Sequence, residues 1–416
     1  MRVFISGYFG FGNLGDEAIL EAVVLELRRR HPDAAIAATF GSEKSSAARL
    51  QLEVVDFFDL DGIATSVARA HLVLFGLGGV FMDYWGAASA ALFREGSAGI
   101  EAYARPALLA RMERVPAALF CGGVGPLRTP AGRAMVRMAS EAADLLLVRD
   151  GSSAREILDI APRAKPVVAV DPAHLLAATG DDRRRAAASL QAAGIGGGAV
   201  AVAAREWDFD IEREALVARL ARALATLPPD VPLVFLPFHC GAGTDDRAFA
   251  EAIRAALPGR TSAVIHPRTG GEAIALFEQS SLVVAVRNHA VVFAGCAGTP
   301  VVSLRYDPKV GGSASLLGVE DLMLGIPELD RLPETMARAL AAREAIAARM
   351  AAHRATVLSR LQGAYDLLDG LVASPLGTES PSPEADDHLR RLESLEQELV
   401  RVRSELRSIR VTLRDH

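Results

Sequence analysis

One stretch of the sequence, residues 282–309, constrains the fold more than any other. It begins with an apolar run at 282–286 that has the length of a buried strand. A second apolar run at 290–297 contains small residues and has the length of a helix that lies close to a sheet, and 301–304 is another apolar strand. Strand, helix and strand in this order predict one βαβ unit of a parallel sheet.

Charged and titratable side chains follow both strands of this unit. Arg287 and His289 come after the first strand, and Lys309 comes after the second. Because the carboxyl ends of parallel strands lie at one edge, where open α/β folds bind ligands, we expect these three side chains to converge on one crevice. Two fixed cations and an imidazole suit a small, highly anionic ligand.

Two earlier strands of the second half end in similar side chains. The apolar runs 199–203 and 233–236 are followed by Arg205 and His239, respectively. A lone arginine at a strand end is more often a salt-bridge or capping residue. Several cationic or imidazole tips on successive strands favour a binding site instead.

Residues 1–178 have the same alternation of strands and helices and are predicted to form a first doubly wound domain. A strand at 2–6 runs into a glycine-rich turn and a helix at 17–30, and later strands end in glycine-rich tips at 76–79 and 122–126. Glycine lets the backbone approach a ligand closely, and a helix N-terminus can meet an anion. Tight turns without a ligand remain the alternative.

Gly10, Gly12 and Gly15 formally match the dinucleotide-binding pattern G-x-G-x-x-G. The pattern starts three residues after the strand has ended, and Asp16 follows the last glycine directly, where it would repel a pyrophosphate. Glu43 after the next strand could serve as a ribose ligand. We disfavour this interpretation; a glycine-rich turn with Asp16 capping the helix is a plainer alternative.

The second half of the chain is divided by changes in composition. Residues 179–198 look like a linker with a short helix, and a Pro/Ser-rich stretch precedes the C-terminal tail. The predicted segments are a first Rossmann-like domain at 1–178, a second at 190–326, a helical return segment at 327–372, a linker at 373–385 and a coiled coil at 386–416.

The tail has a strict heptad pattern. Apolar residues step by three and four at Leu392, Leu395, Leu399, Val402, Leu406, Ile409 and Leu413. The g-to-e′ pairs Arg391–Glu396, Glu398–Arg403 and Glu405–Arg410 are opposite in sign, which favours a parallel self-associating coil and hence a homo-oligomer. An amphipathic helix packed on its own domain is the alternative.

Composition narrows the functional classes. A net charge of −6 argues against a general nucleic-acid binder, so any basic site must be local. Three widely spaced cysteines indicate neither disulfides nor zinc and fit a reducing compartment. The N-terminus is unlike a signal peptide and no apolar run has the length of a membrane span, so we expect a cytoplasmic protein, with peripheral contact at the inner face of the membrane left open.

Several short motifs together resemble the polysaccharide pyruvyl transferase family, in the order found there and over roughly residues 1–320. The motifs are Gly7-Tyr8-Phe9-Gly10, Asn13-Leu14-Gly15-Asp16, Gly76-Leu77-Gly78-Gly79, Gly123-Val124-Gly125-Pro126, Arg287-x-His289 and Tyr306-Asp307-Pro308-Lys309. No single motif is very specific, but their ordered combination is. The resemblance implies a GT-B-like fold and transfer of pyruvate from phosphoenolpyruvate to a sugar of a cell-surface polysaccharide or its precursor, usually as a cyclic ketal with release of phosphate.

The resemblance and the residue types together suggest roles. Arg205 and Arg287 are expected to clamp the carboxylate and phosphate of phosphoenolpyruvate, with Lys309 adding charge. His289 is the candidate general acid, and Asp16 is the candidate base that orients or deprotonates an acceptor hydroxyl. The first domain would then bind the acceptor, free or lipid-linked, and the second the donor, without a metal or cofactor. The predicted substrate-binding set is completed by Asn13, Gly15, Gly78, Gly79 and His239.

Two other functional classes remain open from the sequence. A GT-B glycosyltransferase would use a nucleotide sugar bound to the second domain. A degenerate, non-catalytic scaffold held together by the coil is disfavoured by the intact set of Arg205, Arg287, His289 and Lys309.

Overall fold

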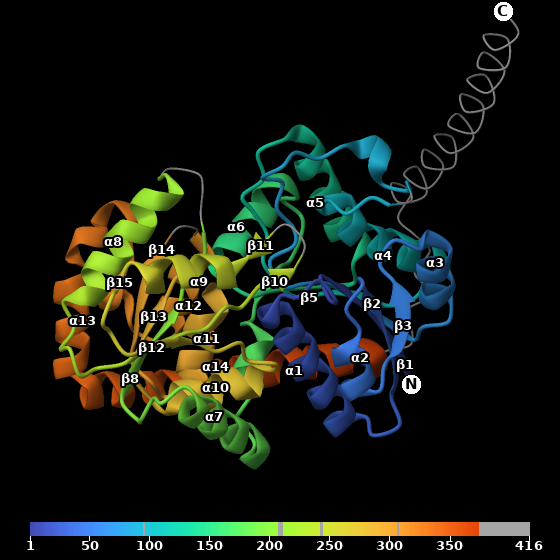
Figure 1. The fold of residues 1–416 in the computed structure, drawn as a ribbon. Coiled ribbons are helices and arrows are strands. Elements are labelled where there is room, and N and C mark those ends of the chain that lie inside the picture. The colour runs from blue at the N-terminus through green and yellow to red at the C-terminus, as the bar shows by residue number, and fades with distance from the viewer. Residues whose placement is uncertain (95, 207–210, 242–243, 306–307, 374–416) are drawn as a thin grey trace, which may run out of the picture. The chain divides into compact units, whose positions relative to one another are not determined.

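Each half of the chain forms a parallel sheet flanked by helices in the computed structural model (Figure 1). The structure describes residues 1–416 except 95, 207–210, 242–243, 306–307 and 374–416. Residues Met1–Val372 cluster as one compact unit. The two parallel sheets confirm the predicted doubly wound α/β fold class.

The first sheet has seven parallel strands in the order β3-β2-β1-β4-β5-β6-β7. Its strands are β1 (Arg2–Gly7), β2 (Ala35–Phe40), β3 (Glu53–Asp56), β4 (Leu72–Leu77), β5 (Ala117–Gly122), β6 (Leu145–Val148) and β7 (Val167–Val168). The connecting helices are α1 (Leu14–Arg30), α2 (Ser45–Leu50), α3 (Leu60–Ala68), η1 (Ser89–Ala91), α4 (Ile100–Glu113), α5 (Pro130–Ala142), α6 (Gly151–Ile160) and η2 (Pro172–Leu175).

The second sheet has six strands in the order β12-β9-β8-β13-β14-β15. Its strands are β8 (Ala199–Ala203), β9 (Leu233–Phe235), β12 (Ser262–Val264), β13 (Ser280–Ala285), β14 (Val301–Arg305) and β15 (Met323–Gly325), and β10 (Cys240–Gly241) pairs with β11 (Thr244–Asp245) in a small separate ladder. The helices are α7 (Gly180–Ala192), α8 (Arg213–Ala225), α9 (Asp246–Ala255), α10 (Gly270–Glu278), α11 (Asn288–Ala297), α12 (Pro308–Leu316), η3 (Glu320–Leu322), η4 (Ile326–Arg331), α13 (Leu332–Ala341) and α14 (Arg343–Ala373).

The expected βαβ unit is β13-α11-β14. Val283 of β13 pairs with Val301 of β14 in parallel register, and α11 joins the two strands. The buried residues of β13 and β14 are mostly apolar on both faces of the sheet, because helices cover both sides of a parallel sheet.

Alternate residues of the first sheet pack into two different cores. Leu72 and Leu74 of β4 belong to a core that includes α1 and continues into the second domain. Val73 and Phe75 belong to a second core with α3, α4 and α5. Side chains alternate between the faces of a strand, so each face is covered by its own helices.

Helix α1 begins earlier than its sequence pattern predicts. It starts at Leu14 rather than at residue 17, and Asn13 is its N-cap, accepting a hydrogen bond from the backbone N–H of Gly15. The interpretation of Asp16 as the capping residue was therefore wrong, because Asn13 takes that position. Asp16 instead lies inside the first helical turn, with its carboxylate available for other contacts.

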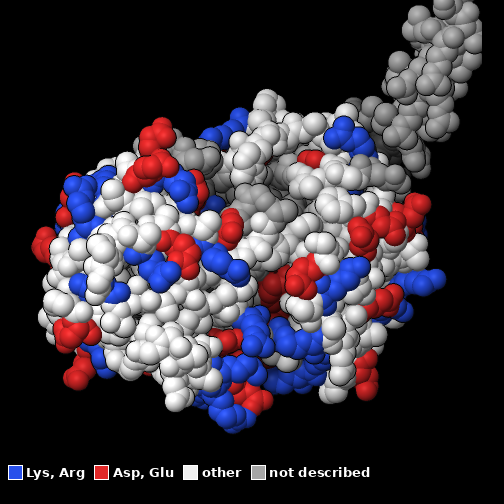
Figure 2. All heavy atoms as spheres, viewed as in Figure 1, with Lys and Arg blue, Asp and Glu red and all other residues white. Residues whose placement is uncertain are grey.

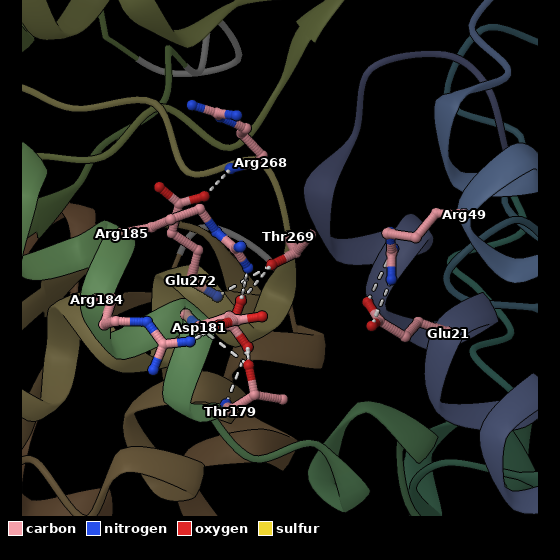
Figure 3. Close-up of polar contacts among 10 residues, drawn as sticks. Glu21, Arg49, Thr179, Asp181, Arg184, Arg185, Arg268, Thr269 and Glu272 are labelled. Carbon is pink, nitrogen blue, oxygen red and sulfur yellow. Dashed lines mark hydrogen bonds and ion pairs between the residues drawn. The ribbon is translucent and has the colours of Figure 1, made fainter.

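The segment expected to be a linker contains the packed helix α7. Thr179 and Asp182 form a reciprocal capping box at its start, and Thr269 Oγ1 at the start of α10 donates a hydrogen bond to Asp182 Oδ1 at 3.3 Å. Figure 3 shows this capping region with the neighbouring arginines. Helix α7 is therefore attached to the helical layer of the second sheet.

Helix α14 connects the end of the second domain to the first. Arg30 of α1 forms ion pairs with Asp366 and Asp369 of α14, and His31 Nε2 lies 2.9 Å from Asp369 Oδ1. The proposed linker and coiled coil at 373–385 and 386–416 lie outside the described residues, apart from Ala373 at the end of α14. In the described part of the chain, every helix is too short or too polar for a membrane span.

Candidate functional site

Most of the predicted site residues follow strands at the places where strand order reverses in the two sheets, whereas His239 follows β9 and Lys309 follows β14. In the first sheet this switch point lies between β1 and β4, and in the second it lies between β8 and β13. Ligands of open α/β folds bind outside the carboxyl ends of strands at such points. The residues that follow these strands are Asn13, Gly15 and Asp16 after β1, Gly78 and Gly79 after β4, Arg205 after β8, and Arg287 and His289 after β13.

Backbone hydrogen bonds join the turn after β1 to the segment that follows β9. Leu14 N donates to Phe238 O at 2.8 Å, and Cys240 N donates to Gly12 O at 3.1 Å. Asn13 and His239 form an isolated antiparallel bridge between these two bonds. The glycine-rich turn after β1 thus contacts the second domain directly.

Asp16 is a nearly buried carboxyl group at this junction, with 7% of the residue exposed. Burial raises the pKa of Asp16 to about 6, supported by the negative charges of Glu17 and Asp171 and opposed by the positive charges of His289 and Arg149. A carboxyl group that titrates near neutral pH can act as a general base.

Close packing around Asp16 requires two glycines. A Cβ atom added to Gly15 would lie 2.0 Å from His289 Nδ1, and one added to Gly78 would lie 2.5 Å from Asp16 Oδ1. Gly78 also has a φ of +84°, which residues other than glycine rarely adopt. Asn13 Nδ2 donates a hydrogen bond to Asp16 Oδ2. The expected Asn13-x-Gly15-Asp16 motif therefore builds one small cluster with His289.

His289 reaches across from α11 to Asp171 of the first domain. Its Nε2 lies 3.3 Å from Asp171 Oδ2, and both side chains are largely buried. Burial alone would raise the pKa of Asp171, but His289, Arg149 and the backbone N–H of Ala173 lower it to about 2. Asp171 therefore stays ionised at neutral pH and favours a proton on Nε2 of the imidazole.

Arg149 is a site residue that sequence analysis did not single out. It follows β6, is 7% exposed, and its Nη1 lies 3.9 Å from Asp171 Oδ2. Cβ atoms added to Gly79 and Gly123 would lie 3.2 Å and 2.4 Å from its Nη2. Its position directly after an apolar strand is the same signal that pointed to Arg287.

Arg287 is bound by a carboxylate that the sequence did not reveal. Its Nε donates to Asp246 Oδ2 at 2.8 Å, and its Nη2 donates to Asp246 Oδ1. Asp246 Oδ2 also accepts from the backbone N–H groups of Phe238 and His239, at 3.2 Å and 3.0 Å. Arg287 and His289 thus contact different carboxylates, Asp246 and Asp171.

Arg205, His239 and Lys309 complete the predicted donor side. Burial lowers the pKa of His239 to about 4, with Arg287 and Arg205 contributing positive charge and Asp246 and a contact to the Phe11 carbonyl opposing them. His239 is therefore neutral at pH 7, and Arg205 lies close enough to affect it. The side chain of Lys309 lies outside the described residues.

Tyr8 and Asn288 are two further polar residues at the junction. Tyr8 stacks on Phe11, and burial raises the pKa of its hydroxyl, with Asp16 adding to the effect and Arg287 opposing it. Asn288 Oδ1 accepts from Ser313 Oγ at 2.9 Å, while its buried Nδ2 has no hydrogen-bond partner among the described residues. Both side chains offer neutral donors at neutral pH.

A separate group of arginines lies on the surface near α7 and α2. Figure 2 shows basic side chains gathering at the lower centre of the drawn face, among acidic ones. In Figure 3, Arg49 pairs with Glu21 at 2.6 Å, and Arg184 pairs with Asp181. Such exposed pairs compensate one another's charge, so this group is a weaker candidate for an anion site than the strand ends.

The junction is electrostatically two-sided. The first domain contributes the carboxyl groups of Asp16 and Asp171 together with Arg149, and the second contributes Arg205, His289 and Arg287, the last paired with Asp246. The described residues include no group of three or more His, Cys, Asp or Glu side chains placed to hold a metal ion. The arrangement can bind an anion and move protons between an imidazole and a carboxyl group.

Solved structures with a similar fold include sugar-nucleotide epimerases and glycosyltransferases. The UDP-GlcNAc 2-epimerase of Neisseria meningitidis bound to UDP-GlcNAc is 15% identical, with a TM-score of 0.53 over 87% of this chain and 100% of the epimerase. A glycosyltransferase of Rickettsia africae is 8% identical, with a TM-score of 0.59 over 90% of this chain and 99% of that protein. At such identities the similarity shows the fold alone, and it confirms the GT-B-like architecture.

Comparison with protein families gives a more specific result. None of the curated proteins matches the chain. The family model described as polysaccharide pyruvyl transferase matches residues 13–308, which include the end of the glycine-rich turn from Asn13 onward, the switch point of the second sheet and the βαβ unit. The chain therefore belongs to the polysaccharide pyruvyl transferase family and is an enzyme.

Proposed function

We propose that this enzyme transfers pyruvate from phosphoenolpyruvate to two hydroxyl groups of a saccharide, forming a cyclic ketal and releasing phosphate. The observation that carries the proposal is the two-sided junction. A strand edge that carries Arg205, Arg287 and His289 in one domain faces, across backbone contacts, a carboxyl group in the other whose pKa is raised to about 6. Family membership supports the same reaction class.

The donor would bind on the cationic side. Phosphoenolpyruvate carries a carboxylate and a phosphate, and guanidinium groups bind both with paired hydrogen bonds. Arg205 and Arg149 are the candidate clamps, the latter from the first domain. Arg287 pairs with Asp246, as Arg149 does with Asp150 and Asp171, so a ligand oxygen would have to share the remaining donors of either arginine. Lys309 is proposed to add charge.

The proposed reaction needs one proton acquired at carbon and two lost from oxygen. Protonation of the donor methylene carbon creates an oxocarbenium-like centre at the neighbouring carbon. One sugar hydroxyl adds there and loses its proton. A second hydroxyl then replaces the phosphate and also loses its proton. Of the two protons released, one restores the acid that protonated the carbon, and the other leaves on the phosphate.

His289 and Asp16 are the candidate acid and base. If the Nε2–H of His289 is directed to Asp171, Nδ1 is the ring atom that can exchange a proton with substrate, and it lies on the side of Gly15. Asp16 follows Gly15 and would accept the proton of an acceptor hydroxyl. Asp171 would act on the reaction through His289, as a positioning residue.

Calorimetric titration with phosphoenolpyruvate tests the donor assignment without knowledge of the acceptor. We expect saturable binding that Arg205→Gln weakens about 10- to 100-fold, because a hydrogen bond to a charged group contributes about 1.5–3 kcal/mol. Arg184→Gln is the matched control, since Arg184 pairs with Asp181 on the exposed surface. UDP-GlcNAc serves as the parallel ligand.

The alternative outcomes separate the functional classes. Binding of UDP-GlcNAc without binding of phosphoenolpyruvate would reject the proposal in favour of a nucleotide-sugar glycosyltransferase. Equal loss of phosphoenolpyruvate binding in Arg205→Gln and Arg184→Gln would reject the clamp. Binding of phosphoenolpyruvate would justify a screen of saccharides for acceptor-dependent phosphate release.

A further inference from the structure

The connection between β4 and α4 carries an uncharged stretch on the protein surface. Residues 84–93 contain no acidic or basic side chain, and within them Trp85 is 86% exposed and Phe93 is 42% exposed. Ala88, Ser89 and Ala90 between them are also exposed. Connecting segments usually expose polar residues, and an almost fully exposed tryptophan is uncommon in a soluble protein.

The start of this stretch is fixed by a buried carboxylate. Asp83, which is 2% exposed, accepts hydrogen bonds from the backbone N–H groups of Arg128 at 2.6 Å and Thr129 at 2.7 Å. Gly86 N donates to Asp83 O at 2.9 Å and closes a turn that displays Trp85. The tryptophan is therefore presented by an anchored turn next to the α5 N-terminus.

The end of the stretch is fixed by a buried arginine. Arg105 of α4 is 0% exposed, and its guanidinium donates to the carbonyl groups of Leu92, Ala91 and Arg94, the last two at 3.3 Å and 3.1 Å. A buried guanidinium is costly unless it is hydrogen-bonded, so these contacts bind the segment firmly to α4. The exposed aromatic side chains are thus supported at both ends.

The side-chain chemistry of residues 84–93 distinguishes between two kinds of ligand, a saccharide and a lipid membrane. A saccharide site needs several hydrogen-bonding side chains for sugar hydroxyls, but Tyr84, Trp85 and Ser89 are the only residues of 84–93 with a polar side-chain group. Tryptophan and phenylalanine next to small residues suit the interfacial layer of a membrane.

Two exposed arginines flank the apolar residues. Arg94 follows Phe93, and the guanidinium of Arg128 lies over the ring of Tyr84 at 5.0 Å from its centroid. They complement anionic headgroups, although the net charge of the whole chain is −6.

We propose that residues 84–94 and Arg128 form a docking surface for an anionic lipid bilayer, with Trp85 and Phe93 inserted at the headgroup level. The same connection begins with Gly78 and Gly79 at the candidate site, and the six residues from Gly79 to Trp85 span at most about 20 Å. Docking therefore holds the site close to the membrane surface. Its use in presenting a lipid-linked acceptor rests on the proposed function.

Vesicle co-sedimentation of the full-length protein tests this surface. The probes are phosphatidylcholine vesicles with and without phosphatidylglycerol. We expect binding to the anionic vesicles that the double change Trp85→Ser and Phe93→Ser weakens by about tenfold or more, since burial of even one large apolar side chain corresponds to about that factor. Arg94→Gln should weaken binding about fivefold, on anionic vesicles only.

Leu25→Ser is the matched control because Leu25 is an exposed apolar residue on α1, with 50% exposure, outside this surface. It should leave vesicle binding unchanged, and unfolding temperatures of all variants verify that they fold. Absence of wild-type vesicle binding, or equal binding by the double variant, would overturn the proposal. The proposal would also be overturned if the double variant kept vesicle binding but lost binding on a glycan array. The same holds if it kept vesicle binding but changed its oligomeric state in light scattering.

Phosphoenolpyruvate titration of the same protein separates the two proposals. Vesicle binding without phosphoenolpyruvate binding would contradict the proposed function and leave the docking surface supported. Phosphoenolpyruvate binding without vesicle binding would contradict only the docking surface.

Discussion

Asp16 owes its chemistry to where its helix begins. Because Asn13 caps α1, the carboxyl group of Asp16 does not cap the helix and instead packs into the junction beside His289. Burial there disfavours the charged form, which raises its pKa to about 6. Between pH 5 and 7 the group changes from mostly protonated to mostly ionised.

We therefore predict that kcat/KM for phosphoenolpyruvate falls as the pH drops below about 6, because the ionised carboxylate is the form that accepts a proton. Asp16→Asn should lower kcat at least about 100-fold and remove this limb of the pH profile. The measurement is acceptor-dependent phosphate release across pH. Asp33→Asn, an exposed carboxylate, should change neither quantity. An unchanged acid limb in Asp16→Asn would exclude Asp16 as the base.

The raised pKa of Asp16 also makes the free energy of unfolding depend on pH. The effect of Asp16 is opposite in sign to that of Asp171. The folded state holds the Asp16 proton more tightly than the unfolded state, so this group lowers the free energy of unfolding as pH rises from about 4 to 6. Asp171, with a pKa of about 2, contributes stability that is present above about pH 4 and is lost as pH falls toward 2. A catalytic and a positioning carboxylate would thus differ in their linkage to folding.

Asp171→Asn tests the positioning role. The amide keeps the shape of the side chain but removes the charge that favours a proton on His289 Nε2. We predict a fall in kcat of about 10²- to 10⁴-fold with little change in KM for phosphoenolpyruvate, and a displaced pH profile. Because Asp171 also caps η2, Asp59→Asn at the N-cap of α3 is the control for lost helix capping. If Asp171→Asn lowered only the unfolding temperature, Asp171 would be merely structural.

At the scale of elements, apolar periodicity predicted the sheets well. The strand expected at 199–203 is β8, and the βαβ unit expected around 282–304 is β13-α11-β14. These runs are apolar on both faces because helices cover both sides of a parallel sheet. A continuous apolar run is visible in the local sequence, so such strands can be recognised without knowing the fold. Element boundaries near glycines were less predictable, as α1 shows.

The partners of the site residues were not predictable from local patterns. Asp246 is 41 residues from Arg287, and Asp171 lies in another domain from His289. Which carboxylate meets which cation depends on how the helices and loops pack, and no spacing in the sequence encodes it. Arg149 could have been found, because it ends an apolar strand as Arg287 does.

Gly15 links helix geometry to the site. We predict that Gly15→Ala lowers activity at least about 100-fold, because an added Cβ would lie 2.0 Å from His289 Nδ1 and displace the ring. Gly363→Ala in α14 is the matched control: its added Cβ meets nothing within 4 Å, and it should raise the free energy of unfolding by about 0.5–1 kcal/mol. The measurements are phosphate release and chemical unfolding. Full activity of Gly15→Ala would show that His289 works from another position.

At the scale of the whole described unit, α14 joins the two domains. Its Tyr365 is 1% exposed and lies edge-on to Phe120 of β5, with ring centroids 5.0 Å apart. Arg30 of α1 lies over the same ring at 5.2 Å. A helix that follows the second sheet therefore contributes to the core of the first, and the two domains share one continuous apolar cluster.

This arrangement predicts opposite effects for two changes at one position. Among the described residues, the buried hydroxyl of Tyr365 has no hydrogen-bond partner, so Tyr365→Phe removes an unsatisfied polar group and should raise the free energy of unfolding by up to about 1 kcal/mol. Tyr365→Ala should lower it by about 3–5 kcal/mol, because the cavity lies where α14 meets the first sheet. Leu367→Ala, on the same helix with 45% exposure, should stay within about 0.5 kcal/mol of wild type. Chemical unfolding measures all three, and a Tyr365→Phe protein as unstable as Tyr365→Ala would mean that the hydroxyl, and not the ring, holds α14 to the first domain.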